Sequence, residues 1–227
     1  MPATTSDLLL LADGRLPAGG HAHSGGLEQA VELGDVRDIA TLEGFLDGLL
    51  RSNAGTAIAV AAAACAARIA GSDARLIELD VEESARTPSA ALRVASRAQG
   101  RQLLRAAEAI WPEPGRVALP PLPHGPHLAL AQGLAAARLD LSPLDAARLA
   151  AYAAISGPAT AAVRLLGLDP FSVHGTVARV VRGAEPLLVA AADAAGDGAA
   201  ALPCGAAPLI EIGAELHRVR EIRMFAS

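Results

Sequence analysis

Apolar residues recur at helical spacing along much of this chain. Between residues 38 and 51, for example, Ile39, Leu42, Leu46 and Leu49 follow one another at intervals of three or four. This spacing places them on one face of an α-helix. No stretch of the sequence resembles a pair of β-strands. The pattern therefore predicts an all-α fold.

Glycine and proline residues divide the sequence into segments of helical length. Three dipeptides combine a helix N-cap residue with proline at the first helical position: Thr87-Pro88, Ser142-Pro143 and Asp169-Pro170. The sequence predicts helices over residues 6–12, 24–33, 38–51, 56–69, 73–83, 88–110 and 208–220, and two more that begin at Pro143 and Pro170. We expect a single compact domain, residues 1–227, of roughly eight to ten helices.

The composition indicates how such a core is built. Hydrophobic residues make up 52% of the 227 residues but aromatic residues only 2%, so Ala, Leu, Val and Ile must fill the interior. The mean hydropathy of +0.35 is high, yet the longest apolar stretch, residues 57–67, is shorter than the about 20 residues of a membrane span. The N-terminus carries Asp7 and no basic segment. We expect a cytoplasmic protein that does not enter a membrane.

Charge and residue types exclude several functions. A net charge of −5 argues against nucleic acid as the main partner. All 19 basic residues are Arg, and without Lys neither a Walker-type phosphate loop nor a Schiff base can form. Cys65 and Cys204 lack the spacing of a zinc site. Because no catalytic constellation or nucleotide motif is evident, we expect a protein that is not an enzyme and needs no cofactor.

One predicted helix carries an unusual row of charges. Arg93, Arg97, Arg101 and Arg105 recur every four residues and cover an arc of roughly 120°. Like charges at this spacing repel one another. Two interpretations remain open: a solvated helix face with local ion pairs, or a surface that binds an acidic partner. Gln99 points toward the apolar side and requires a buried hydrogen-bond partner.

The segment from residue 8 to residue 28 reads LLLLADGRLPAGGHAHSGGLE and contains five glycines and two histidines. We expect Gly19, Gly20, Gly25 and Gly26 to shape a tight turn in which at least one of them has a positive φ. Ser24 is expected to cap a helix that begins at Gly25. A phosphate cradle is the weaker interpretation, because the segment lacks both Lys and a preceding strand.

This segment resembles the N-terminal signature of the urease accessory protein F (UreF) family, L-x-x-L-A-D-S-x-L-P-x-G-x-x-x-H-S-x-G-L-E. The matching positions are Leu8, Leu11, Ala12, Asp13, Leu16, Pro17, Gly19, His23, Ser24, Gly26, Leu27 and Glu28. The segments at residues 95–104 and 223–227 are similar to the family patterns A-S-R-x-Q-G-R-x-L-L and R-L-F-x-S. Residues 184–207 and 215–218 depart from the family pattern.

The resemblance implies an all-α protein that supports GTP-dependent insertion of nickel into apo-urease without catalysing a reaction itself. Its implied partners are accessory protein D (called H in some bacteria), the GTPase accessory protein G and apo-urease, in a complex that contains a dimer of this chain. The residues that we expect to bind partners are Arg97, Gln99, Arg101, Arg223, Phe225 and Ser227. The residues expected to shape the N-terminal loop are Gly19, Gly20, His23, Ser24, Gly25 and Gly26.

Two further questions stay open at this point. The first is whether the protein holds nickel itself, through His21 and His23 with His217 as a further ligand, although two histidines alone supply few ligands. The second concerns Phe225, which lies near the end of the chain. It either folds back onto the core of this protein or docks onto accessory protein D.

Overall fold

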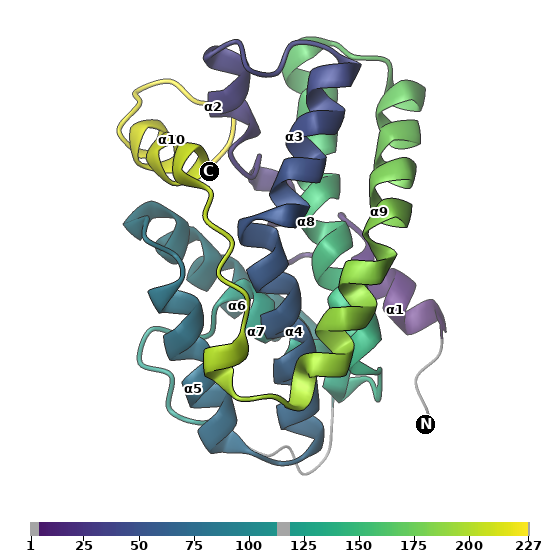
Figure 1. Ribbon diagram of the computed structural model, residues 1–227, viewed down its shortest axis with the longest axis vertical. Coiled ribbons are helices and arrows are strands. Elements are labelled where there is room, and N and C mark those ends of the chain that lie inside the picture. Colours follow the sequence, from purple (N-terminus) through teal and green to yellow (C-terminus); the bar gives the residue numbers. More distant parts are fainter. Residues whose placement is uncertain (1–4, 113–118, 227) are drawn as a thin grey trace.

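The computed structural model describes residues 5–112 and 119–226 (Figure 1). Within these residues the chain forms ten α-helices and three short 3₁₀ helices and contains no strand, which confirms the predicted all-α fold. The α-helices are α1 (Thr5–Ala12), α2 (Leu27–Glu32), α3 (Ile39–Arg51), α4 (Asn53–Ile69), α5 (Asp73–Ala85), α6 (Ala90–Ile110), α7 (Leu128–Arg138), α8 (Pro143–Leu166), α9 (Pro170–Asp193) and α10 (Pro208–Arg218). The 3₁₀ helices are η1 (Gly20–Ala22), η2 (Ala194–Gly196) and η3 (Ala199–Ala201).

Helix α4 occupies the centre of the bundle and packs against α5, α7, α8 and α9. Twelve of its 17 residues are buried, and most of these are alanines. Small side chains let the neighbouring backbones come very close. A Cβ atom at Gly133 of α7 would lie only 2.4 Å from the carbonyl oxygen of Ala61. The alanine-rich composition thus produces close helix packing in place of an aromatic core.

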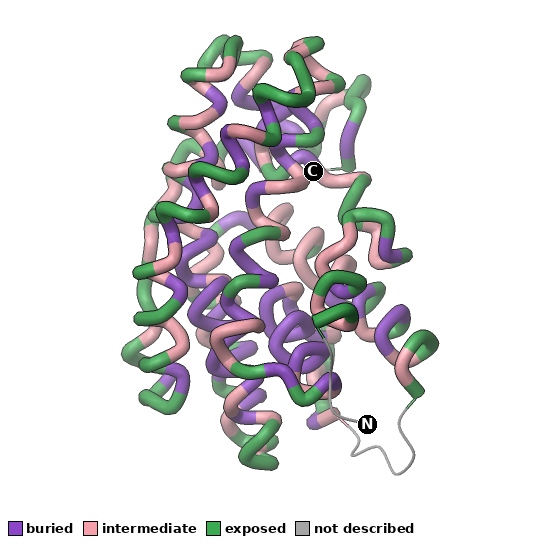
Figure 2. The backbone as a smooth tube through the Cα atoms, turned by 90° about the vertical axis from the view of Figure 1, so that its right-hand side faces the viewer, coloured by how far each residue is buried: buried purple, intermediate pink, exposed green. Residues whose placement is uncertain are grey.

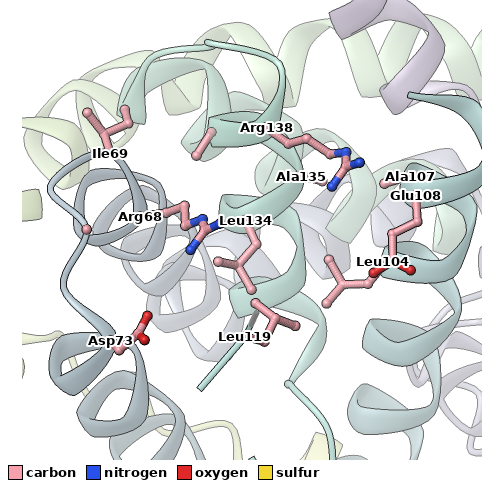
Figure 3. A pocket seen from close by; sticks show the side chains of 12 residues that line it. Arg68, Ile69, Asp73, Leu104, Ala107, Glu108, Leu119, Leu134, Ala135 and Arg138 are labelled. Atoms are coloured by element: carbon pink, nitrogen blue, oxygen red, sulfur yellow. The ribbon is translucent and has the colours of Figure 1, made fainter. Parts of the chain in front are cut away.

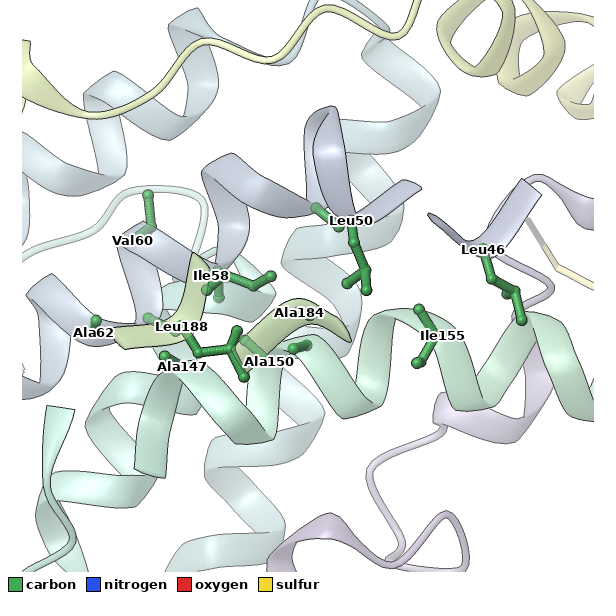
Figure 4. Packing of buried hydrophobic residues seen from close by; sticks show 14 of the residues in the cluster. Leu46, Leu50, Ile58, Val60, Ala62, Ala147, Ala150, Ile155, Ala184 and Leu188 are labelled. Carbon is green, nitrogen blue, oxygen red and sulfur yellow. The ribbon is translucent and has the colours of Figure 1, made fainter. Parts of the chain in front are cut away.

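Larger side chains fill the space between the long helices. Leu46 and Leu50 of α3 meet Ile155 of α8, while Ile58 of α4 lies near Leu188 of α9 (Figure 4). Buried positions concentrate on the inner helices, and the loops and outer helix faces are exposed (Figure 2).

Several predicted helix starts are confirmed, and three are wrong. Helix α4 begins at Asn53, three residues before the predicted start at residue 56. Ser142 and Asp169 cap α8 and α9, which begin at the following prolines. Helix α6 begins at Ala90 and not at residue 88, because Ser89 is its N-cap and accepts a hydrogen bond from the amide of Leu92. Likewise α2 begins at Leu27, directly after its N-cap Gly26, and not at residues 24–25 as predicted. The Ser24 hydroxyl still accepts a hydrogen bond from the Glu28 amide.

By length and composition alone, helix α8 is long and apolar enough to cross a membrane. Helices α3 and α4, which are bent by 46° relative to each other, are also long and apolar enough if the two are counted as one span. In the structure α8 packs against α3, α4, α7 and α9, and ten of its residues are buried. Its apolar composition is therefore accounted for by its place in the core.

Candidate functional site

The arginine row on α6 faces the protein as well as solvent. Arg97 is mostly buried and forms an ion pair with Asp80 of α5, with 2.9 Å between Nη2 and Oδ2. The same guanidinium donates to the Ser84 hydroxyl and to the carbonyl oxygen of Gly125. The sequence left two interpretations of the arginine row, a solvated helix face or a surface for an acidic partner. Neither describes Arg97, because its carboxylate partner Asp80 belongs to the same chain and the ion pair is buried in the protein.

A buried histidine completes this polar network. The ring of His127 lies between two hydroxyls, with Nδ1 3.0 Å from Ser96 Oγ and Nε2 2.9 Å from Ser84 Oγ. Burial and the neighbouring Arg97 lower the pKa of His127 to about 4. Burial, with a smaller contribution from Asp80, raises the pKa of Glu83 to about 8. At neutral pH His127 and Glu83 are therefore both uncharged.

The rest of the motif at residues 95–104 positions the loop before α7. Gly100 lies directly against it, since a Cβ atom there would be 2.3 Å from the carbonyl oxygen of Pro126. Arg101 is exposed and donates to the carbonyl oxygen of His124 over 2.7 Å. Gln99 is half-buried. Of the partner-binding residues predicted on this helix, Arg101 has its head at the surface and Arg97 does not.

The N-terminal loop adopts the expected glycine conformations. Gly19, Gly25 and Gly26 have φ values of 79°, 60° and 89°, which confirms the prediction of at least one positive φ. Gly20 begins the 3₁₀ helix η1 instead. Ser24 is buried, and His23 is half-buried. The loop brings the start of α2 against the C-terminal part of the chain.

Glu28 of α2 joins these two ends of the chain. Its side chain is only 6% exposed. It accepts hydrogen bonds from the backbone amides of Met224 (2.7 Å) and Phe225 (3.0 Å) and lies 2.9 Å from Nε2 of His217. Burial opposes ionisation of Glu28, but these hydrogen bonds outweigh it and lower the pKa of the carboxyl. Glu28 is therefore an ionised carboxylate inside the protein.

The tail, residues 220–226, folds back onto this chain. Phe225 is 5% exposed and belongs to the main hydrophobic cluster, and the guanidinium of Arg164 lies 5.3 Å from the centre of its ring. This is the fold-back alternative for Phe225, and it leaves that ring unavailable for docking in this conformation. Arg223 is exposed and donates to the carbonyl oxygen of Arg218. Ser227 lies outside the described residues.

Helix α10 is attached to α6 by its acidic residues. Glu215 accepts hydrogen bonds from the Ser89 hydroxyl (2.7 Å) and the Ala91 amide (2.8 Å), and Glu211 accepts one from the Ser89 amide (2.6 Å). The hydrogen bond from Ala91 is the largest cause that lowers the pKa of Glu215 to about 2. An anionic side chain at a helix N-terminus also interacts favourably with the helix dipole.

The opposite side of α10 is apolar and exposed. Leu209, Ile212, Leu216 and Val219 follow one another at intervals of three or four residues, and each is between 50% and 78% exposed. We call these four residues the α10 face. In the tail that follows, Ile222 and Met224 are 85% and 56% exposed. An exposed apolar helix face such as the α10 face is typical of a protein-binding site.

The three histidines proposed as nickel ligands do not share one arrangement. His217 is buried against Glu28, whereas His21 is exposed. The pKa of His23 is lowered, mainly by burial and to a smaller extent by the charge of His21. Among the residues that the structure describes, no group of three or more His, Cys, Asp or Glu side chains is arranged to hold a metal ion.

A pocket of about 310 Å³ lies elsewhere, between α4, α6 and α7 (Figure 3). Leu104, Leu119 and Leu134 line it together with charged residues of both signs, namely Arg68, Asp73, Glu108 and Arg138. None of the site residues predicted from sequence lines this pocket.

Comparison with known proteins decides the family. A profile of the UreF family matches residues 36–181. The urease accessory protein UreF of Mycobacterium sp. (strain JLS) is 42% identical over 224 residues, which cover 99% of each chain. The chain belongs to the UreF family. Its UreF relatives include those of Mycolicibacterium vanbaalenii, 41% identical over 99% of this chain and 100% of its own, and of Mycobacterium tuberculosis, 45% identical over 73% and 75%.

UreF membership gives the site a general role, that of a urease accessory protein. Two features of the site were not recognised from sequence. The α10 face is visible in the spacing of Leu209, Ile212, Leu216 and Val219, although the sequence does not tell an exposed apolar face from a buried one. Glu28 is part of the N-terminal signature, but its partners lie almost 200 positions away and nothing in the sequence connects them.

Proposed function

We propose that this UreF protein is a non-catalytic scaffold in urease maturation. In the cytoplasm it assembles with accessory protein D (H), the GTPase accessory protein G and apo-urease, and a dimer of the chain supports GTP-dependent nickel insertion. Membership of an accessory-protein family supports this proposal. So does the kind of surface that the chain offers, which is suited to binding other proteins.

The α10 face is the observation that carries the proposal. Burial of one Leu or Ile side chain contributes about 1.5–3 kcal/mol, and a few such side chains commonly dominate a protein interface. Glu211 and Glu215 attach α10 to the start of α6 and so fix the orientation of the face. A preorganised apolar helix is suited to a groove on another protein. We assign accessory protein D to this face.

Arg101 belongs to a second surface in this proposal. Its head is exposed, and its hydrogen bond in this chain goes to a carbonyl oxygen, so its charge remains available to an acidic partner. Arg97 contributes indirectly, since it holds the loop at Gly125 through an internal contact. We assign the exposed end of the arginine row, Arg101 and Arg105, to an acidic surface of accessory protein G or apo-urease.

Co-expression tests the assignment of the α10 face. The double variant Ile212→Glu/Leu216→Glu should keep its helix content but no longer co-purify with accessory protein D, because two charges would be buried at the interface. The matched control is Ile69→Glu/Val81→Glu, which places the same two charges at exposed apolar positions of α4 and α5. Full recovery of accessory protein D with the α10 variant would rule out this face.

Equilibrium dialysis against nickel separates the scaffold from a protein that holds the metal itself. The scaffold hypothesis predicts that the His21→Ala/His23→Ala variant binds as little nickel as the unsubstituted protein. Stoichiometric nickel binding that this double substitution abolishes would favour the metallochaperone.

A further inference from the structure

A buried carboxyl, that of Glu83 on α5, lies beside the polar network of His127. Its side chain is 8% exposed, and its Oε2 atom has no hydrogen-bond partner among the residues that the structure describes. Its Oε1 atom lies 4.0 Å from Nδ1 of His127, a distance too long for a hydrogen bond. A buried carboxylate needs donors that replace its hydration, whereas an uncharged carboxyl does so far less. Ionisation of Glu83 would therefore draw donors away from their present partners.

Arg97 of α6 is one source of such donors, but its terminal nitrogens are already engaged. Nη1 donates to Oδ1 of Asp80 and to the carbonyl oxygen of Gly125, and Nη2 donates to Oδ2 of Asp80 and to the Ser84 hydroxyl. These four bonds account for the four hydrogens of the two nitrogens. Arg97 can therefore turn toward Glu83 only if it gives up one of these bonds.

His127 is the other source, and its hydrogen bonds identify its tautomer. The Ser84 hydroxyl donates to the carbonyl oxygen of Asp80 over 3.0 Å, so Nε2 of His127 donates to Ser84 Oγ. Nδ1 is then an acceptor, and the Ser96 hydroxyl donates to it over 3.0 Å. The nitrogen that faces Glu83 thus carries no proton. It becomes a donor to a carboxylate only if the ring leaves Ser96.

The two side chains that a carboxylate would recruit also attach the loop before α7. Arg97 donates to the carbonyl oxygen of Gly125 in this loop. His127 is the N-cap residue of α7, and the next amide, that of Leu128, donates to Ser96 Oγ over 3.0 Å. A shift of the His127 ring away from Ser96 would disturb this bond, and a shift of Arg97 would release the carbonyl oxygen.

The charges that act on Glu83 come from α5 and α6. Burial raises the pKa of Glu83 to about 8, the charge of Asp80 on the same helix adds to this effect, and the charge of Arg97 opposes it. Arg93 of α6, together with Arg97, disfavours the protonated form of His127. In the closed arrangement both Glu83 and His127 are therefore uncharged at neutral pH.

The other elements that pack against α5 are α4, α7 and η3. The charged residue of α4, Arg68, lies beside Asp73 at the opposite end of α5. The charged residue of α7, Arg138, is in its last turn, at the far end from His127. The 3₁₀ helix η3 consists of alanines.

We infer that Glu83 makes the attachment of the loop before α7 sensitive to pH. While the carboxyl keeps its proton, Arg97 and His127 hold the loop against α5 and α6. When the proton is released to solvent, these two side chains turn toward the carboxylate and the loop detaches. The inference concerns the fold of this chain and is independent of the partners proposed above.

Native-state hydrogen exchange of the His127 and Leu128 amides tests this role. After correction for the intrinsic effect of hydroxide, their protection should fall about tenfold per pH unit from pH 6.5 to 8 and then level off, because the open form releases a proton that the closed form keeps. Low concentrations of urea should hardly change their exchange, since a local opening exposes little surface. The amides of α4 should remain far more protected and respond strongly to urea.

Substitution of Glu83 supplies the second arm of the test. In Glu83→Gln the protection of the two amides should not depend on pH, because the amide side chain does not titrate. Glu83→Met also lacks a titrating group and replaces this variant if Glu83→Gln does not fold. Glu78→Gln, at a largely exposed position of the same helix, is the matched control and should keep the pH dependence.

Two results would overturn the inference. If the His127 and Leu128 amides show the same protection and urea dependence as those of α4 at every pH, Glu83 titrates only with global unfolding and no local attachment is released. If the pH dependence persists in the Glu83 variants, another group causes it. The first result is obtained on the unsubstituted protein and decides even if both Glu83 variants fail to fold.

Discussion

The Arg97 guanidinium and the Asp80 carboxylate form an ion pair between α6 and α5, with 2.9 Å between Nη2 and Oδ2 and both side chains largely shielded from solvent. The pair anchors the polar network around His127, since the amide of that residue also lies 3.4 Å from Oδ1 of Asp80. The most prominent charge pattern in the sequence thus contains a residue whose contacts stabilise the fold.

The main effect of replacing Arg97 should therefore be a loss of stability of the fold. We expect Arg97→Ala to lower the free energy of unfolding by about 3 kcal/mol, because Asp80 would remain as a buried charge without its partner. Arg105→Ala, on the same helix with an exposed head, should change it by less than about 0.5 kcal/mol. Urea denaturation measures both values. Equal effects of the two substitutions would contradict the internal role of Arg97.

Gly100 should respond to substitution in the opposite sense from an ordinary helical glycine. Alanine in a helix interior is normally more stable than glycine by about 1 kcal/mol. At Gly100 the added methyl group would meet the carbonyl oxygen of Pro126 at 2.3 Å, so Gly100→Ala should destabilise the protein. Gly183→Ala in α9, where nothing lies within 4 Å, should stabilise it. A higher Tm for both variants in thermal unfolding would contradict the close approach of Gly100 to the carbonyl oxygen of Pro126.

The stability of the protein should fall as pH rises from about 6.5 to 8. Burial raises the pKa of Glu83 from 4.5 to about 8. In this range the native state keeps a proton that the unfolded state has released, so the free energy of unfolding decreases with pH. The expected loss is about 2 kcal/mol over the interval. His127, with its pKa lowered to about 4, acts in the opposite direction but only below about 6.5.

The variant Glu83→Gln tests whether Glu83 causes this pH dependence of stability, because the glutamine amide does not titrate. Chemical denaturation at several pH values should show a flat profile between 6.5 and 8 for this variant. Glu78→Gln, at a largely exposed position of α5, should retain the slope of the unsubstituted protein. A slope that persists in Glu83→Gln would assign the pH dependence to another group.

The tail should contribute to the stability of the protein. Phe225→Ala should lower the free energy of unfolding by about 3 kcal/mol, because the ring is part of the main core cluster. Removal of residues 217–227 should lower it further, since Glu28 would lose His217 and both tail amides. Met224→Ala, at an exposed position, is the control. A truncated protein with an unchanged Tm would show that the tail is not part of the folded core.

Local signals allowed much of the fold to be predicted. Ser142 and Asp169 cap their helices through hydrogen bonds within three residues, and such contacts are encoded in the adjacent sequence. Thr87-Pro88 carries the same local signal but does not begin a helix. Helix α6 starts at Ala90 because Ser89, the residue after this pair, is the N-cap. Glu211 and Glu215 of α10 add hydrogen bonds to Ser89 and Ala91 from far along the chain, and the local sequence does not show these contacts.

The candidate site was less predictable because its contacts are distant in sequence. A row of arginines looks the same whether its carboxylate partner is on another protein or, like Asp80, 17 positions away. Phe225 near the end of a chain is compatible with both docking and fold-back, and only the cluster that surrounds it distinguishes the two. Glycine conformations were predictable, since few other residues adopt a positive φ.

The partners of Glu28 also set an order of events during protein synthesis. Residue 28 leaves the ribosome long before residues 224 and 225, so its carboxylate must stay hydrated while most of the bundle folds. The hydrogen bonds from the Met224 and Phe225 amides to Glu28 therefore form only after the ten α-helices of the bundle have been synthesised.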